Sequence, residues 1–277
     1  MNVFWFRRDL RLEDNIGLYK ALKFNNSVIP VFIFDDEILD GLSKDDARVS
    51  FIYDSLKSIH IELQKLGSSL IVKKGNTSDV WKELVSEHTI ENVFFNKDYE
   101  PYAIARDQNI MTFLGSINIP VQVFKDQVIF EEGEIKKNDG LPYTVFTPYK
   151  NKWLKKFNQE GGVEVCKLKK HASNFYNIKK DFPSIESLGF AQSKIKVNPY
   201  NLSSIAEYDL VRDFPSKDQT SYLSPYLRFG LISVREMVKF ALETNATFLN
   251  ELIWREFFMQ IIYHFPKSVT HNFKRKY

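Results

Sequence analysis

The sequence predicts an α/β fold built on a doubly wound, five-stranded parallel sheet, followed by a long linker and an incomplete all-helical region. Three observations predict it. Short apolar runs alternate with amphipathic helical patterns over residues 1–130. Lysine, serine, asparagine and glycine become frequent between residues 160 and 198. From residue 199 onward only helical periodicity remains. We therefore expect three segments, 1–130, 131–198 and 199–277.

Each expected strand is a run of aliphatic, β-branched and aromatic residues. The run at Ser27–Phe34 is apolar throughout, as in strands that are covered on both faces of a parallel sheet. Because parallel strands need helical crossovers, the alternation with helices favours a right-handed, doubly wound sheet. The expected strands are Asn2–Phe6, Ser27–Phe34, Ser68–Gly75, Ile90–Asn96 and Ile117–Phe124.

Helical patterns separate these strands, and the third pattern is preceded by the capping residues Asn76, Thr77 and Ser78. Four helices are few for a region that must bury so many aromatic side chains, so we expect the helical region to be incomplete. The expected helices are Ile16–Phe24, Arg48–Leu66, Ser78–His88, Ala103–Leu114, Tyr149–Phe157, Ser203–Asp213, Tyr222–Phe229, Val234–Glu243 and Phe248–Phe265.

Composition excludes several classes of protein. The single cysteine, Cys166, allows neither an internal disulfide nor a CxxC motif. No run of 18 apolar residues predicts a transmembrane helix, so we expect a cytoplasmic protein without membrane contact. The histidines lack ligand-like spacing, and no metal site is predicted. The turn after the first strand, RRDLRLED, has no glycine, which argues against a dinucleotide-binding turn there.

Charge is unevenly distributed. Residues 1–150 carry 18 Lys/Arg and 23 Asp/Glu, a net charge of −5, whereas residues 151–277 carry 20 and 12, a net charge of +8. A basic, aromatic-rich second half is typical of nucleic-acid binding, although solvated lysines would give the same pattern. The basic residues 274–276 are interpreted as a solvated tail.

Two local patterns have both a structural and a functional interpretation. In LNELIWREFFMQ, residues Glu251, Trp254 and Arg255 share one helical face. They could form a surface ion pair beside a half-buried indole, or a recognition surface. In TSYLS, the hydroxyls of Thr220, Ser221 and Ser224 could cap a helix or bind phosphate.

Four longer stretches are more specific. WFRRDLRLEDN, VFTPYKNKW, TSYLSPYLRFG and NELIWREFF resemble the DNA photolyase/cryptochrome family in identity, order and spacing, with most likeness to class I cyclobutane pyrimidine dimer photolyases. The resemblance covers the whole chain. It implies an N-terminal α/β domain that holds an antenna chromophore, an interdomain linker and a helical FAD-binding domain. That helical domain is longer in the family, so its C-terminal part is absent from this sequence.

The resemblance implies light-driven repair of cyclobutane pyrimidine dimers by electron transfer from reduced FAD. Trp254 would provide a stacking surface for the flipped dimer, and Glu251 would form a hydrogen bond to its polar edge. Arg212 would contact DNA. The implied flavin-binding residues are Tyr208, Thr220, Ser221, Leu223, Ser224 and Arg255. The alternatives are a cryptochrome-type photoreceptor and an inactive fragment that binds FAD poorly.

The resemblance also implies damaged DNA as the partner of a monomer, and an antenna chromophore of unknown identity. Folate is not expected, because Tyr102 and Ala103 replace the family's Asn-Glu pair and GLSKDDARV lacks the folate histidine. A deazaflavin, a flavin or no antenna remain open. An antenna would lie near Arg7, Asp9, Asp36 and the Glu37–Leu42 stretch.

Overall fold

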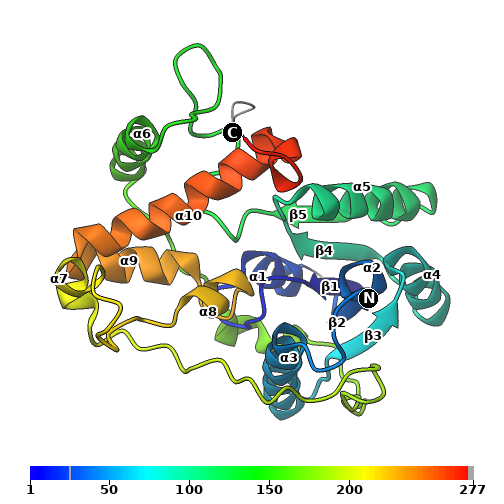
Figure 1. Cartoon of the computed structure of the whole chain (residues 1–277). Coiled ribbons are helices and arrows are strands. Elements are labelled where there is room, and N and C mark those ends of the chain that lie inside the picture. The colour runs from blue at the N-terminus through cyan, green and yellow to red at the C-terminus, as the bar shows by residue number, and fades with distance from the viewer. Residues whose placement is uncertain (25, 274–277) are drawn as a thin grey trace.

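The computed structural model describes residues 1–24 and 26–273. Its centre is a parallel sheet in the order β3-β2-β1-β4-β5 (Figure 1). This order confirms the predicted five-stranded, doubly wound sheet. The strands are β1 (Asn2–Phe6), β2 (Val28–Asp35), β3 (Ile71–Gly75), β4 (Asn92–Asn96) and β5 (Val121–Phe124).

Helices cover both faces of the sheet because successive strand residues point to opposite sides. Phe4 and Phe6 of β1 pack against one pair of helices, whereas Val3 and Trp5 pack against the other. The first pair is α1 (Ile16–Lys23) and α3 (Ala47–Lys65), and the second is α4 (Thr77–Glu87) and α5 (Pro101–Ser116). A one-turn helix, α2 (Asp36–Leu39), follows β2 directly.

Four predicted strands begin too early, and those for β3, β4 and β5 do so by two or more residues. The structure shows why: residues before β3 and β5 close the preceding helices instead of joining the sheet. Ser68 N donates to Leu63 O at the end of α3, and Ile119 N donates to Leu114 O at the end of α5. These are helix C-terminal bonds that satisfy otherwise unpaired carbonyls. An apolar run cannot distinguish such a cap from the first residues of a strand.

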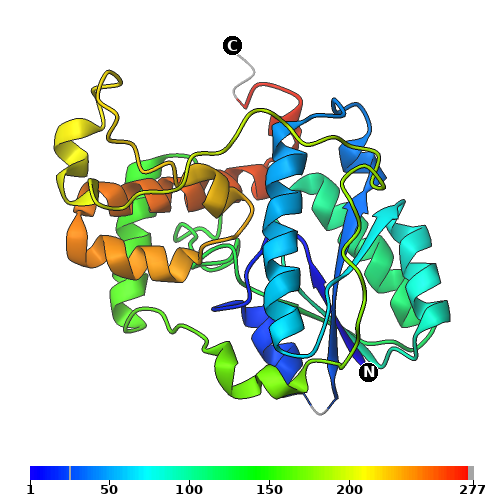
Figure 2. The ribbon, with the colours of Figure 1, turned by 90° about the horizontal axis from the view of Figure 1, so that it is seen from below.

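The segment after α6 (Phe146–Gln159) crosses the α/β unit, and Figure 2 shows it running past α3. It contains one 3-10 helix, η1 (Leu168–Asn174), and Tyr176 N donates to Val28 O at 2.8 Å. Apolar side chains from this segment are buried with α1 and α3, so it is packed rather than solvated. They are Leu168, Phe175, Ile185, Leu188 and Phe190.

The remaining helices form a second core with α6, on the side of the molecule away from α4 (Figure 1). They are α7 (Tyr208–Val211), α8 (Ser224–Arg228), α9 (Val234–Thr244) and α10 (Ala246–His264), with short 3-10 turns η2 (Ile205–Glu207) and η3 (Pro266–Val269).

The predicted helix at Ser203–Asp213 is wrong in extent, because only η2 and α7 are helical there. Asn201 Oδ1 accepts from Ser203 N, a local bond that competes with helix formation. The predicted helix at Tyr222–Phe229 is also too long. Tyr222 has φ +51°, outside the right-handed region, so α8 begins only at Ser224.

Buried ion pairs join the helical core to the α/β unit. Arg235 of α9 contacts Asp14 Oδ2 at 2.9 Å and Asp126 Oδ1 at 2.8 Å, and Arg11 also pairs with Asp126 at 2.8 Å. Arg235 and both acids are buried. The segment after α8 lies directly on the loop after β1, because Gly230, at φ +68°, approaches so closely that a Cβ would lie 2.3 Å from a backbone oxygen.

None of the helices within the described residues has the length and hydropathy needed to cross a bilayer. Within the same residues, no group of three or more His, Cys, Asp and Glu side chains is arranged to hold a metal ion.

Candidate functional site

Helix α10 presents different residues on opposite sides. Asn245 caps its first turn by accepting from Thr247 N and Phe248 N. Leu252, Ile253 and Phe257 are buried in the second core. The Glu251 and Trp254 side chains lie on the other side and are partly exposed. Two of the three residues expected on one face, Glu251 and Trp254, therefore border solvent together.

The indole of Trp254 is one of a group of stacked rings. Phe146, the first residue of α6, lies parallel to it, with 3.6 Å between ring centroids and 8° between planes. Phe258, one turn further along α10, lies 5.3 Å away at 23°. Trp254 is not sealed in the core, but its surface is shared with these two phenyl rings. Sequence analysis did not identify Phe146, because 108 positions separate it from its partner.

Glu251 pairs with Arg212, which follows α7. Arg212 Nη1 lies 2.5 Å from Glu251 Oε1, and about a third of each side chain is exposed (33% and 32%). The Arg212 guanidinium also lies over the ring of Tyr208, 5.3 Å from its centroid. Burial, together with the negative charge of Glu251, raises the pKa of Tyr208. The structure thus brings together three predicted site residues from two helices.

Arg255 is directed elsewhere. Its Nη1 donates to Gln127 O at 2.7 Å and its Nη2 to Leu227 O at 3.3 Å. Burial and the nearby positive charge of Arg8 lower the pKa of Arg255 to about 10. The arginine therefore ties α10 to α8 and to the chain after β5. Its predicted contact with flavin stays a prediction.

The predicted flavin-binding loop leads into α8. Thr220 and Ser224 are exposed, and their hydroxyls have no hydrogen-bond partner within the described part of the chain. Leu223 is buried in the second core, and its N–H donates to Ser221 Oγ at 3.4 Å. Thr220 on the loop and Ser224 at the first position of α8 thus offer free hydroxyls on either side of a buried leucine, and hydroxyls can donate hydrogen bonds to phosphate.

A buried carboxylate on α10, which sequence analysis missed, holds α10 in place. Glu256 accepts hydrogen bonds from Ile129 N at 2.6 Å, Phe130 N at 3.2 Å, Tyr149 Oη at 3.1 Å and Trp153 Nε1 at 2.8 Å. Burial raises the pKa of Glu256 to about 7, against the lowering effect of these donors. An acid within the buried stripe of α10 was the signal that could have identified it.

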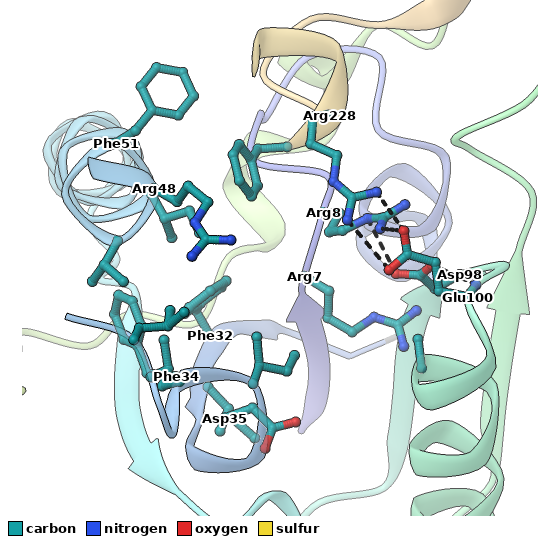
Figure 3. A pocket seen from close by; sticks show the side chains of 18 of the residues that line it. Arg7, Arg8, Phe32, Phe34, Asp35, Arg48, Phe51, Asp98, Glu100 and Arg228 are labelled. Carbon is teal, nitrogen blue, oxygen red and sulfur yellow. Dashed lines mark hydrogen bonds and ion pairs between the residues drawn. The ribbon is translucent and has the colours of Figure 1, made fainter. Parts of the chain in front are cut away.

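A second candidate site is a pocket of about 810 Å³ at the C-terminal edge of the sheet (Figure 3). Its lining includes Arg7 and the Glu37–Leu39 segment with Leu42, which belong to the region where an antenna is expected. Asp9 and Asp36 do not line it. Asp9 is buried behind β1, where it accepts from Arg7 N and Asn96 Nδ2. Aromatic rings contribute much of the wall: Trp5, Phe32, Phe34, Phe51, Tyr102 and Phe229.

One side of this pocket carries a cluster of charges. Arg8 lies 2.6 Å from Glu100 and 3.4 Å from Asp98, and Arg228 of α8 lies 2.5 Å from Glu100 (Figure 3). Arg48 faces them from α3, across the pocket. Arginines beside aromatic walls suit a flat, anionic ligand. Residues from α8 line the pocket too, so the helical core contributes to it.

Comparisons with known proteins decide the family. The model of the family described as DNA photolyase matches residues 2–168. The chain belongs to this family. It is 31% identical to a deoxyribodipyrimidine photo-lyase of Halobacterium salinarum, over 99% of this chain and 64% of that protein. This member of the DNA photolyase family thus spans less than two thirds of the length of that curated relative.

Solved structures of photolyases have the same fold. A photolyase from Sulfolobus tokodaii with two FAD molecules is 29% identical, with a TM-score of 0.77, and the alignment covers all of this chain and 63% of that one. A class III photolyase from Agrobacterium tumefaciens is 25% identical, with a TM-score of 0.80, over 99% of this chain and 61% of that one. The basic residues Lys274, Arg275 and Lys276 lie outside the described residues.

Proposed function

We propose that this chain takes part in light-driven repair of cyclobutane pyrimidine dimers in DNA, as a deoxyribodipyrimidine photo-lyase. One observation carries the proposal: on a partly exposed surface, Arg212 pairs with Glu251, and Trp254 lies about one helical turn from Glu251 on α10. This combination supplies a flat apolar ring, a hydrogen-bond acceptor and a cation. A flipped pyrimidine dimer beside a phosphate needs all three.

FAD is the proposed cofactor, and the chain's own residues fit part of it. The free hydroxyls of Thr220 and Ser224 would hold phosphate, with Ser221 and Leu223 shaping the loop. Tyr208 packs near Glu251 at the same end of α10. When bound and reduced, FAD supplies the electron that splits the dimer. The protein's task is to orient the lesion and exclude water.

Trp254 would orient the lesion by stacking. Base–aromatic stacking contributes about 1–3 kcal/mol per base. Phe146 supports the indole from one side and fixes its plane. Glu251 would then accept a hydrogen bond from a pyrimidine imide N–H, which an intact base pair does not expose.

The 810 Å³ pocket is the proposed antenna site. The Sulfolobus tokodaii relative was solved with two FAD molecules and an implied light-harvesting role for one. The aromatic walls and the arginines of this pocket support a flavin-like, anionic chromophore here as well. Fluorescence of riboflavin 5′-phosphate added to the purified chain tests this. Quenching that is lost in Phe51→Ala supports the site, and quenching that survives places the ligand elsewhere.

The repair assay uses an oligonucleotide with one thymine dimer, the 277-residue chain and added reduced FAD. Blue light should restore the intact strand, and darkness should not. Flavin photochemistry without repair would support a photoreceptor of the cryptochrome kind instead. Trp254→Ala should weaken binding of the damaged oligonucleotide by about 1–3 kcal/mol. Phe24→Ala is the control. It removes another partly exposed ring, at the end of α1, and should leave the affinity for the damaged oligonucleotide unchanged.

A further inference from the structure

The Arg212–Glu251 ion pair joins two residues that the proposed function uses separately. We propose that this pair is a latch that makes the site selective for damaged DNA. Arg212 and Glu251 stay paired with each other until DNA supplies a new partner for both. A phosphate would bind Arg212, and the polar edge of the lesion would bind Glu251. The inference rests on the proposed function, because it concerns the same surface.

The geometry shows that the latch joins two separate elements. Arg212 follows α7 and Glu251 lies on α10, and Figure 1 shows these helices side by side at one end of the helical core. Nη1 and Oε1 are 2.5 Å apart. Within the described residues, Arg212 is the sole hydrogen-bond or ion-pair partner of Glu251. Arg212 has one further acid nearby, Asp213, at 3.6 Å.

Opening the pair requires little free energy. About two thirds of each side chain is covered, but both still contact water, and exposed ion pairs contribute little to stability. A DNA phosphate offers the guanidinium an anion of matching geometry with charge-assisted hydrogen bonds. Exchange of Glu251 for phosphate is therefore favourable whenever a DNA backbone lies against α7.

The exchange leaves Glu251 without a partner, beside Trp254 and close to the incoming phosphate. A partly desolvated carboxylate in that position is unfavourable. Undamaged DNA relieves this less, because its bases stay in the stack and, in a duplex, their imide N–H groups are also held in base pairs. A flipped dimer can, because its imide N–H is free to donate to the carboxylate. The latch thus lowers affinity for undamaged DNA more than for damaged DNA, which is a repulsive route to specificity.

The test measures binding in the dark of two labelled single-stranded oligonucleotides that differ only in one thymine dimer. Glu251→Ala should raise affinity for the undamaged strand, by about fivefold if the pair contributes at the upper end for exposed pairs. The same variant should lower affinity for the dimer strand. Glu251→Gln keeps the side-chain volume, and should shift the two affinities in the same opposite directions by smaller factors.

Asp213→Ala is the matched control, because it removes a negative charge beside the same arginine. The Asp213 carboxylate lies 3.6 Å from Arg212 and its side chain is 82% exposed. It should raise both affinities equally. Arg212→Ala should weaken binding of both strands. It should also reduce the slope of log affinity against log salt concentration by about 0.7, the value for one phosphate contact on single strands. In that background, Glu251→Ala should no longer raise affinity for the undamaged strand.

The outcomes separate the two proposals. If the unaltered chain binds both strands equally, the proposed function is wrong and the latch with it. If it prefers the dimer strand, but Glu251→Ala lowers its affinity for both strands in parallel or leaves its affinity for the undamaged strand unchanged, only the latch is wrong. In that case the pair is a structural contact between α7 and α10, and Arg212→Ala and Glu251→Ala should each lower the melting temperature.

Discussion

Removing one hydroxyl from the Glu256 cluster tests whether this buried carboxylate anchors α10. Tyr149 is almost completely buried, and its Oη donates to Glu256 Oε1 at 3.1 Å. Tyr149→Phe deletes the donor and keeps the ring, which packs 5.2 Å from Phe257. The substitution therefore changes one hydrogen bond and little else.

The magnitude follows from the charge of the acceptor. Hydrogen bonds to charged groups contribute about 1.5–3 kcal/mol, and those between neutral groups about 0.5–1.5 kcal/mol. Because burial raises the pKa of Glu256 to about 7, the carboxylate is mostly charged at pH 8 and mostly neutral at pH 5.5. Tyr149→Phe should thus lower the free energy of unfolding by about 1.5–3 kcal/mol at pH 8, and by less at pH 5.5.

Urea unfolding at the two pH values measures this, with Tyr143→Phe as the control. The ring of Tyr143 lies 6.3 Å from that of Tyr149, and its hydroxyl has no hydrogen-bond partner among the described residues. The control should change stability by less than about 0.5 kcal/mol. Equal effects of the two variants, or an effect that does not depend on pH, would refute the anchoring role.

Three further predictions concern stability. A raised pKa of about 7 against 4.5 means that Glu256 contributes stability at low pH that is lost as pH rises to 7. Between pH 4.5 and 7, the free energy of unfolding of Glu256→Gln should therefore rise by about 3 kcal/mol relative to that of the unaltered chain, as urea titrations measure. A difference between the two chains that does not change with pH would contradict this. Gly230→Ala should prevent folding or lower the melting temperature far more than Gly41→Ala, because nothing lies within 4 Å of the latter. Arg235→Ala should cost about 3–5 kcal/mol, since it leaves two buried acids unpaired, whereas Lys73→Ala, at a more exposed pair, should cost under about 1 kcal/mol by calorimetry.

The order of elements could be predicted because period and polarity are local properties. A continuous apolar run such as that of β2 has few other uses in a chain of this composition. The ends of elements depend on bonds that the pattern does not encode. Ser68 closes α3 because its N–H donates to Leu63 O, and the positive φ of Tyr222 means that α8 begins only after that residue. Both are decided by local geometry rather than by hydrophobicity.

The candidate site divides in the same way. Helical spacing predicts that Glu251, Trp254 and Arg255 share a face; Glu251 and Trp254 border solvent together, whereas the Arg255 guanidinium bonds Gln127 O and Leu227 O. Spacing could not predict that Glu251 pairs with Arg212, 39 positions earlier, or that Phe146 lies on the indole of Trp254. Such contacts follow from how α6, α7 and α10 pack. Glu256 was accessible to inference, because it is an acid in a buried stripe.

The packing of α10 explains how the proposed recognition surface can lie on a helix that is also central to a core. Glu256 and Gln260 bond the chain after β5, since Gln260 Nε2 donates to Phe130 O at 3.0 Å. Arg255 bonds α8 from the adjacent side. These contacts fix rotation about the helix axis, because successive residues are 100° apart. The stripe with Glu251 and Trp254 is left facing solvent in one orientation. Side chains held on such a rigid element keep their geometry before a ligand arrives, which is what selective recognition of a flipped base requires.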